Sequence, residues 1–177
     1  MENVKRAKRI KMILMDVDGT LTDGSILLLP DGQEAKSYNV RDGMGMLLAR
    51  LAGLSTGIIT GKSSAALEKR ARLLRVNELH QGILNKGPVY EAIRKKYGLR
   101  NEEMAFIGDD LGDLSVLKVV GLAGCVSDAH AEILKQCHFI SRYPGGGGAV
   151  REFIEFILAS QGLLWEKLEE KIANLKG

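Results

Sequence analysis

The sequence predicts an α/β fold built on a doubly wound, mostly parallel sheet. Short apolar runs alternate along the chain with segments whose apolar residues recur at helical spacing. Polar residues or glycines directly follow several of these runs, as expected where a buried strand ends in a loop. Alternating strands and helices give a parallel sheet with helices on both faces, and the strand ends then meet at one rim, where ligands bind.

The individual elements follow from these runs. Strands are expected at residues 12–15, 56–60, 104–108, 122–126 and 138–141. Helices are expected at residues 44–52, 63–74, 88–97, 114–119, 129–134 and 149–159. The N-terminus is basic, but only four apolar residues precede Asp16, too few for a signal peptide, so we expect a solvated leader before the first strand.

One segment departs from this alternation and predicts a β-hairpin over about residues 25–40. Its turn is Pro30-Asp31-Gly32, in which Pro presets φ and Gly accepts a positive φ. The arm Ile26-Leu27-Leu28-Leu29 is apolar without alternation. A projecting hairpin with apolar faces is a surface prone to association, so we expect it to be buried against other subunits.

The C-terminal segment, about residues 163–175, predicts an amphipathic helix. Leu164, Leu168, Ile172 and Leu175 recur there at helical spacing among Glu and Lys. Docking on the domain is the expected arrangement, and contact with a neighbouring chain is the alternative. A length of 177 residues suits a single domain, residues 1–177, with a substantial core.

Composition excludes several functional classes. Hydrophobic residues make up 45% and charged residues 27%, which argues against disorder, and no apolar stretch approaches the span of a bilayer. A net charge of +3 with 5% aromatic residues does not indicate nucleic-acid binding. Cys125 and Cys137 form no C-x-x-C pair, and their simplest interpretation is as reduced core residues of a cytoplasmic protein.

Two acidic residues directly follow the first predicted strand. Asp16 and Asp18 lie between the apolar run and Gly19-Thr20. Alternate residues of a strand point the same way, so the two carboxyl groups share one side, where they repel and are costly to bury without a cation. The pair fits a nucleophilic Asp16 with Asp18 as general acid/base. A calcium loop fails on spacing, whereas a simple capping turn remains an alternative.

A second acidic cluster follows the run at 104–108. Asp109, Asp110 and Asp113 lie within five residues, a density that structural roles alone explain poorly. Mg²⁺ prefers oxygen ligands, usually one or two carboxylates with water and phosphate. We therefore expect Mg²⁺ on Asp16, Asp109 and the Asp18 backbone carbonyl. Asp113 would not bind the metal itself but would orient a bound water or a neighbouring ligand. Asp110 either does the same or only caps the following helix.

Groups that suit a phosphate occur at two further positions. The Thr60 hydroxyl and the Gly61 backbone N–H, at the end of a predicted strand, can hold a phosphate oxygen. The alternative for Thr60 is a helix N-cap. Lys86 comes just before a predicted helix and can face the metal across a phosphate, with a solvated surface lysine as the alternative.

In this order, these pieces resemble the haloacid dehalogenase superfamily. The matching residues are Asp16-x-Asp18-Gly19-Thr20, Thr60, Lys86 and Gly108-Asp109-Asp110-x-x-Asp113. The resemblance implies a Rossmann-like domain and an Mg²⁺-dependent phosphatase that forms an aspartyl-phosphate on Asp16. It also implies that Asp18 protonates the leaving oxygen and then activates water, while Thr60 and Lys86 bind the phosphate.

The resemblance extends over nearly the whole chain to the 3-deoxy-D-manno-octulosonate 8-phosphate phosphatase family. It includes Thr22-Asp23-Gly24, Asn39-Val40-Arg41-Asp42-Gly43, Gln81-Gly82, Asn85-Lys86, Asp128-Ala129-His130 and Gly147-Gly148-Ala149-Val150-Arg151-Glu152. The family implies a sugar-phosphate substrate in lipopolysaccharide synthesis and the absence of a cap domain. It also implies a homotetramer in which the hairpins associate and a neighbour closes each active site.

Three basic residues bear on the substrate. Lys62 stands where the family commonly has Arg, so the charge is kept but the planar fork that grips a carboxylate is lost. Arg70 matches a family position and, with Arg41, can hold the substrate's carboxylate; for Arg41, pairing with Asp42 or another neighbour is the alternative. A related class that acts on a nine-carbon keto sugar 9-phosphate tends to carry Glu at position 62 and to lack Arg41, so both residues favour the eight-carbon substrate.

Two other functions remain as alternatives. One is a phosphatase of the same fold with a broad range of sugar phosphates. The other is a non-catalytic tetrameric interaction module. Such a module is expected to lose an acidic or lysine position of the site, and none is lost here.

Overall fold

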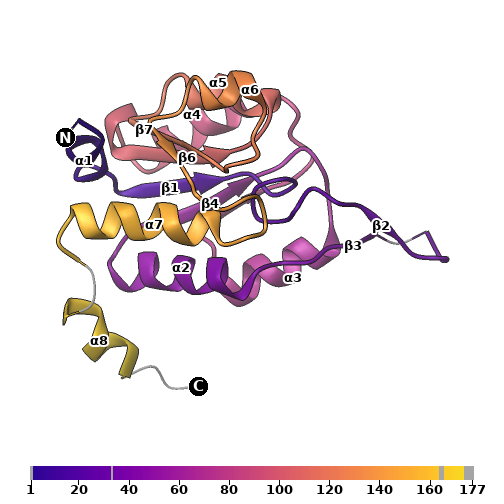
Figure 1. Cartoon of the computed structure of the whole chain (residues 1–177), viewed down its shortest axis with the longest axis horizontal. Coiled ribbons are helices and arrows are strands. Elements are labelled where there is room, and N and C mark those ends of the chain that lie inside the picture. The colour runs from indigo at the N-terminus through magenta and orange to yellow at the C-terminus, as the bar shows by residue number, and fades with distance from the viewer. Residues whose placement is uncertain (1, 33, 164–165, 174–177) are drawn as a thin grey trace.

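The computed structural model describes residues 2–32, 34–163 and 166–173 and contains a six-stranded sheet (Figure 1). Its strands are β1 (Met12–Met15), β4 (Ser55–Ile59), β5 (Glu78–His80), β6 (Met104–Gly108), β7 (Leu122–Cys125) and β8 (Phe139–Ile140). The strand order is β5-β4-β1-β6-β7-β8, and each neighbouring pair is parallel. The predicted parallel sheet is confirmed, and β1 and β6 cover the predicted ranges.

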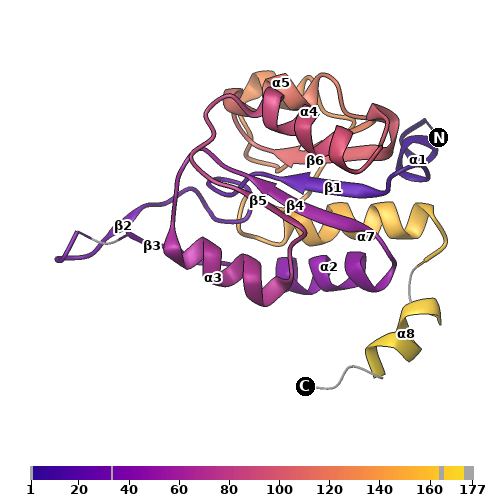
Figure 2. The ribbon, with the colours of Figure 1, turned by 180° about the vertical axis from the view of Figure 1, so that it is seen from behind.

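Helices cover both faces of this sheet, as a doubly wound fold requires. One face carries α2 (Val40–Leu51), α3 (Ala65–Leu74) and α7 (Ala149–Ser160), and the other carries α4 (Lys86–Lys96), α5 (Leu114–Leu117) and α6 (Ala131–Leu134) (Figures 1 and 2). Two buried clusters result, one under each layer of helices. Because β1 and β6 lie in the middle of the sheet, the loops that follow them are held between both layers.

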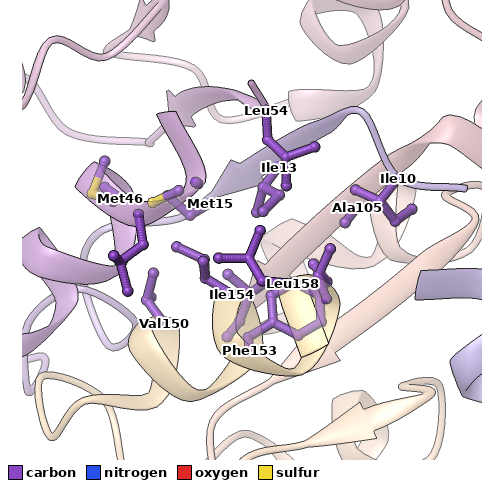
Figure 3. Packing of buried hydrophobic residues seen from close by; sticks show 14 of the residues in the cluster. Ile10, Ile13, Met15, Met46, Leu54, Ala105, Val150, Phe153, Ile154 and Leu158 are labelled. Atoms are coloured by element: carbon purple, nitrogen blue, oxygen red, sulfur yellow. The ribbon is translucent and has the colours of Figure 1, made fainter. Parts of the chain in front are cut away.

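The larger cluster packs α7 and α2 against the central strands (Figure 3). Ile13 and Met15 point to this face from β1, while Leu14 between them belongs to the opposite cluster. Phe153 and Ile154 of α7 are fully buried against them. This alternation fixes which way β1 faces, and so it fixes the direction in which the chain leaves the strand at Asp16.

The basic leader is solvated only in part: Lys5, Lys8, Arg9 and Lys11 are exposed, but the segment also docks on the domain. Residues Glu2–Ala7 form a helix, α1, which packs against α7 and β7 (Figure 1). Ala7 and Ile10 are buried, and the Gln161 side chain donates hydrogen bonds to the backbone carbonyls of both residues. The small apolar side of this short segment was enough to dock it, although most of its residues are charged.

The hairpin projects from the sheet, as Figures 1 and 2 show, and its strands are shorter than predicted. β2 (Leu27–Leu28) pairs antiparallel with β3 (Glu34–Ala35), and helix α2 already begins at Val40. The helix starts there because the Asn39 side chain caps it, accepting a hydrogen bond from the Arg41 backbone N–H at 2.9 Å. Leu27 and Leu28 are 61% and 66% exposed, so the apolar arm is open to a partner.

The C-terminal segment forms α8 (Glu166–Ala173), in agreement with the predicted helix. Leu168 is buried, and Ile172 packs on the larger cluster. The Lys171 ammonium donates a 2.7 Å hydrogen bond to the Leu51 carbonyl at the end of α2. Leu164 and Leu175, the other members of the predicted stripe, lie outside the described residues.

Across the described part of the chain, no helix combines the length and apolar character needed to cross a membrane.

Candidate active site

The predicted site residues gather at the carboxyl-terminal rim of the sheet. Asp16 follows β1, Thr60 follows β4, and Asp109 follows β6. These three strands are neighbours in the order β4-β1-β6, so their ends lie side by side. Residues that are 93 positions apart in sequence, from 16 to 109, are thereby brought together because parallel strands end at a common edge.

A buried lysine bridges two of the carboxylates. Lys86, the first residue of α4, contacts the Asp16 carboxylate and lies 2.6 Å from Asp113 Oδ1. Asp16, Lys86 and Asp113 are only 7%, 5% and 2% exposed. The ammonium also lies 5.7 Å from the centroid of the Phe106 ring. Lys86 is therefore part of the site, and the alternative of a solvated surface lysine is wrong.

Asp109 is positioned by two residues of the loop after β1. The Thr20 hydroxyl donates a 2.8 Å hydrogen bond to Asp109 Oδ1. Gly19 has φ of +93°, and a Cβ on it would lie 2.1 Å from Asp109 Oδ2. Glycine is needed here both for the backbone conformation and for the space that the carboxylate occupies. The Asp16-to-Thr20 loop thus supplies two acidic groups, Asp16 and Asp18, and positions a third, Asp109.

The other two acidic residues organise the loop after β6. Asp113 Oδ2 accepts hydrogen bonds from the backbone N–H groups of Asp109, at 3.0 Å, and Asp110, at 3.3 Å. Asp110 accepts a 2.7 Å bond from the Leu111 N–H and caps the 3₁₀ turn at Leu111–Asp113. Asp110 therefore has the capping role that was one of its two alternatives, whereas Asp113 faces Lys86 and holds the loop.

Burial and mutual repulsion shift the titration of these groups. Burial raises the pKa of Asp16 to about 6; the Lys86 ammonium opposes the shift and Asp113 adds to it. Burial also raises the pKa of Asp109 to about 7, with the nearby carboxylates adding to it and the Thr20 hydrogen bond opposing it. Burial alone would lower the pKa of Lys86, but Asp16 and Asp113 raise it above its ordinary value. The single ammonium group of Lys86 does not balance the charge of the three carboxylates of Asp16, Asp109 and Asp113.

The cluster has the composition and size of a site for a hard cation. Carboxylate oxygens of Asp16, Asp109 and Asp113 all lie within 4.8 Å of one another. An oxygen-only donor set of this kind suits Mg²⁺. A bound divalent cation would offset the burial and the repulsion that raise the two carboxyl pKa values, so the residues fit the ion. Both oxygens of Asp113 accept hydrogen bonds, Oδ1 from Lys86 and Oδ2 from two backbone N–H groups, whereas Asp16 and Asp109 each accept one through Oδ1. Asp16 and Asp109 are therefore the better ligands.

Thr60 lies at the end of β4 but does not cap the following helix. Its side chain is buried, and its hydroxyl oxygen accepts a 3.5 Å bond from the Lys62 backbone N–H. Ser64 caps α3 instead, accepting from the Leu67 N–H, so the capping alternative for Thr60 is wrong. Gly61 and Lys62 continue the same loop, and Lys62 is exposed.

The two arginines considered for the substrate line separate recesses. Arg41 is exposed and lines a recess of about 330 Å³ together with Arg142 and Arg151. Arg70 lies 6.0 Å above the Tyr38 ring and lines a second recess, of about 470 Å³, beside α2. No hydrogen bond or ion pair joins either side chain to Asp16 or Lys86 within the described residues. Their roles toward a substrate stay predictions.

Two contacts of the site were not expected from the sequence. The first is the hydrogen bond from the Thr20 hydroxyl to Asp109. The motif at residues 16–20 includes Thr20 but does not indicate this partner. Lys36, at the base of the hairpin, forms an ion pair with Asp18. Nothing in the local sequence marks Lys36, because the pair joins two loops that only the fold brings together.

Carboxylates around a buried lysine at the rim of a parallel sheet define a haloacid dehalogenase-like hydrolase, and the model of that family matches residues 74–154. The chain is 37% identical, over 96% of its length and 90% of the relative's, to the 3-deoxy-D-manno-octulosonate 8-phosphate phosphatase of Escherichia coli (strain K12). The chain therefore belongs to the 3-deoxy-D-manno-octulosonate 8-phosphate phosphatase family.

Solved structures agree with this assignment. The crystal structure of the phosphatase of the same name from Yersinia pestis is similar with a TM-score of 0.91 and 39% identity, covering 92% of this chain and 88% of that one. The Moraxella catarrhalis phosphatase, in complex with a magnesium ion, a phosphate ion and a KDO molecule, has a TM-score of 0.91 and 35% identity, covering 99% of this chain and 98% of that one.

Proposed function

We propose that this protein hydrolyses 3-deoxy-D-manno-octulosonate 8-phosphate to the free sugar acid and phosphate, with Mg²⁺ as cofactor, in lipopolysaccharide biosynthesis. The observation that carries the proposal is the buried Lys86 between Asp16 and Asp113, next to Asp109 at the rim of the sheet. Membership of a family whose relatives are phosphatases for this substrate supports the choice of sugar phosphate.

In the first chemical step, a carboxylate oxygen of Asp16 attacks the phosphorus, and the bond from phosphorus to the sugar's O8 breaks. Asp18 gives its proton to O8, so the sugar acid leaves as an alcohol and the phosphoryl group is carried on Asp16. In the second step, water attacks the phosphorus while Asp18 takes the water's proton, which releases phosphate and restores both carboxyl groups.

Most of the acceleration has to come from charge and position. Uncatalysed hydrolysis of phosphate monoesters is so slow that the rate enhancement can approach ~10²¹-fold, whereas acid/base catalysis supplies about 10²–10⁴-fold. Lys86, the Thr60 hydroxyl and the Gly61 N–H are the groups that would bind the phosphoryl oxygens. Thr60 and Lys86 are buried, which strengthens their interactions and requires little rearrangement during the reaction.

Asp16, Asp109 and the Asp18 backbone carbonyl are the groups that would hold Mg²⁺. The ion neutralises charge on the transferring phosphoryl group when bound. Asp113 bonds to the Lys86 ammonium and to the Asp109 backbone N–H, and so keeps Asp109 in position as a ligand.

We propose Arg41, Lys62 and Arg70 as the cationic groups that bind the acidic substrate, with its carboxylate held by those nearest to it. A cationic group on each of three different segments suits an acidic sugar, although Lys62 lacks the bidentate grip of an arginine. The experiment that tests the substrate is phosphate release with Mg²⁺ from the eight-carbon 8-phosphate, a nine-carbon keto sugar 9-phosphate and a panel of hexose phosphates. A kcat/KM clearly highest for the eight-carbon substrate supports the proposal. Equal values across the panel would support a broad phosphatase instead.

We also propose that the chain works as one hydrolase domain in a cytoplasmic homotetramer. The exposed apolar arm of the hairpin supports subunit association. The free cysteines Cys125 and Cys137 suit a reducing compartment.

A further inference from the structure

The side chain of Lys36 is buried although it comes from the base of a projecting hairpin. Its side chain is 5% exposed, and its ammonium forms an ion pair with Asp18 Oδ1. Within the described residues, Lys36 forms no hydrogen bond or ion pair with Asp16 or Asp109, and its charge partner is Asp18 alone. Burying a lysine is costly in desolvation and in side-chain entropy, which makes its partner the reason for its placement.

The backbone around Lys36 is fixed to the domain from the side of α2. Tyr38, two residues on, packs against the larger buried cluster, with Arg70 over its ring. Asn39 donates a 2.8 Å hydrogen bond to the Gly146 carbonyl and caps α2. Lys36 therefore reaches Asp18 from a segment that is anchored to the domain, and not from the projecting end of the hairpin.

Asp18 itself is partly open, with its side chain 29% exposed. The Lys36 ammonium uses only Oδ1 of the Asp18 carboxyl group, so Oδ2 can carry the proton for the leaving oxygen while Oδ1 accepts from the ammonium in both protonation states. A carboxyl group that must reach the leaving oxygen in one step and a water in the next needs a fixed orientation, because small misplacements are costly in proton transfer.

We propose that Lys36 is a positioning residue for the reaction, which holds the Asp18 carboxyl group in the orientation from which it serves the leaving group. This inference rests on the proposed function, in which Asp18 is the general acid/base. Lys36 acts through Asp18 and does not touch the phosphoryl group, which Lys86 faces.

The leaving group distinguishes this role from a structural one. A sugar alkoxide leaves poorly unless it is protonated, whereas p-nitrophenolate leaves without a proton. Single-turnover rates of the first step with the eight-carbon 8-phosphate and with p-nitrophenyl phosphate therefore report on Asp18 separately. Lys36→Met is expected to slow the sugar phosphate by about 10²-fold, in the range of acid/base catalysis, and to leave p-nitrophenolate release near that of the wild type.

Further variants sharpen the test. Lys36→Arg keeps the charge and is expected to restore most of the rate, and Lys118→Met, an exposed lysine, is the matched control. On an Asp18→Asn background, Lys36→Met is expected to add little, because both changes remove the same function. Thermal melting checks that each variant folds, and Lys36→Gln gives the same comparison if Lys36→Met melts early.

Equal losses on both substrates, wild-type rates on both, or a further loss on the Asp18→Asn background would each overturn the positioning role. Those outcomes leave the proposed function intact as long as the wild type hydrolyses the sugar phosphate. A wild type that releases no phosphate would instead remove the proposed function itself.

Discussion

The Asp109 carboxylate occupies the space in which a side chain on Gly19 would stand, since a Cβ at Gly19 would lie 2.1 Å from Asp109 Oδ2. The two residues come from loops after neighbouring strands, β1 and β6. The motif glycine therefore does more than form a turn, because it lets one loop seat the acidic group of the other.

Gly19→Ala is expected to weaken Mg²⁺ binding and to reduce kcat by at least about 10²-fold, because the new methyl group displaces Asp109. Gly53→Ala is the matched control: Gly53 has φ of +88°, but no atom lies within 4 Å of the place that a Cβ would take. Both variants bear a similar backbone strain, of order 1–3 kcal/mol. Isothermal titration with Mg²⁺ that gives the same affinity for both alanine variants would contradict this account of Gly19.

Lys86→Met is expected to lower kcat by about 10²–10³-fold or more, as the loss of a group that stabilises the transition state does. Steady-state phosphate release measures the effect, and Lys118→Met provides a lysine control from the surface. Unchanged kcat and KM in Lys86→Met would remove Lys86 from the site.

The raised carboxyl pKa values predict how pH affects the metal-free protein. Burial raises the folded-state pKa of Asp16 to about 6 and that of Asp109 to about 7, above the ordinary aspartate value of 3.8. Between about pH 4 and pH 7 the folded state therefore binds more protons than the unfolded state, so their contribution to stability falls as pH rises. Relative to Asp109→Asn, the wild type without metal should lose stability across this window.

Mg²⁺ should reverse that trend, because the ion binds the ionised carboxylates. We expect the rise in melting temperature on adding Mg²⁺ to be larger at pH 8 than at pH 5, and EDTA to abolish both this rise and the hydrolysis. A Mg²⁺ effect that is independent of pH, or full activity after metal removal, would be inconsistent with the proposed ligands.

The hairpin predicts a change in assembly. Replacing Leu27 and Leu28 with serine removes two exposed apolar side chains from the arm and is expected to lower the mass measured by light scattering. The wild type is expected to be a tetramer. A monomeric wild type at micromolar concentration would contradict the association of hairpins.

Elements with a strong local pattern could be predicted from the sequence, whereas an element with a weak pattern could not. β1 and β6 are continuous apolar runs that end in aspartate, so both strands and their site residues could be placed from the sequence. β5 (Glu78–His80) was missed because its buried Glu78 is polar. That carboxylate is satisfied by Lys96 at 2.6 Å and Tyr97 at 2.9 Å, contacts that exist only after α4 has packed.

The same difference separates the site residues that could be predicted from those that could not. Asp16, Asp109 and Lys86 follow from where strands end and helices begin. The pair of Lys36 with Asp18, and the position of Asp113 against Lys86, depend on how loops pack across the rim. No periodicity records such contacts, since the partners are separated by irregular chain.

The central claim is that Asp16 is the nucleophile of a magnesium-dependent phosphatase. The most direct measurement is phosphate release from 3-deoxy-D-manno-octulosonate 8-phosphate by the wild type and by Asp16→Asn, with Mg²⁺ present and folding checked by thermal melting. The wild type is expected to release phosphate while the folded Asp16→Asn variant shows no turnover. Wild-type turnover in Asp16→Asn would contradict the account.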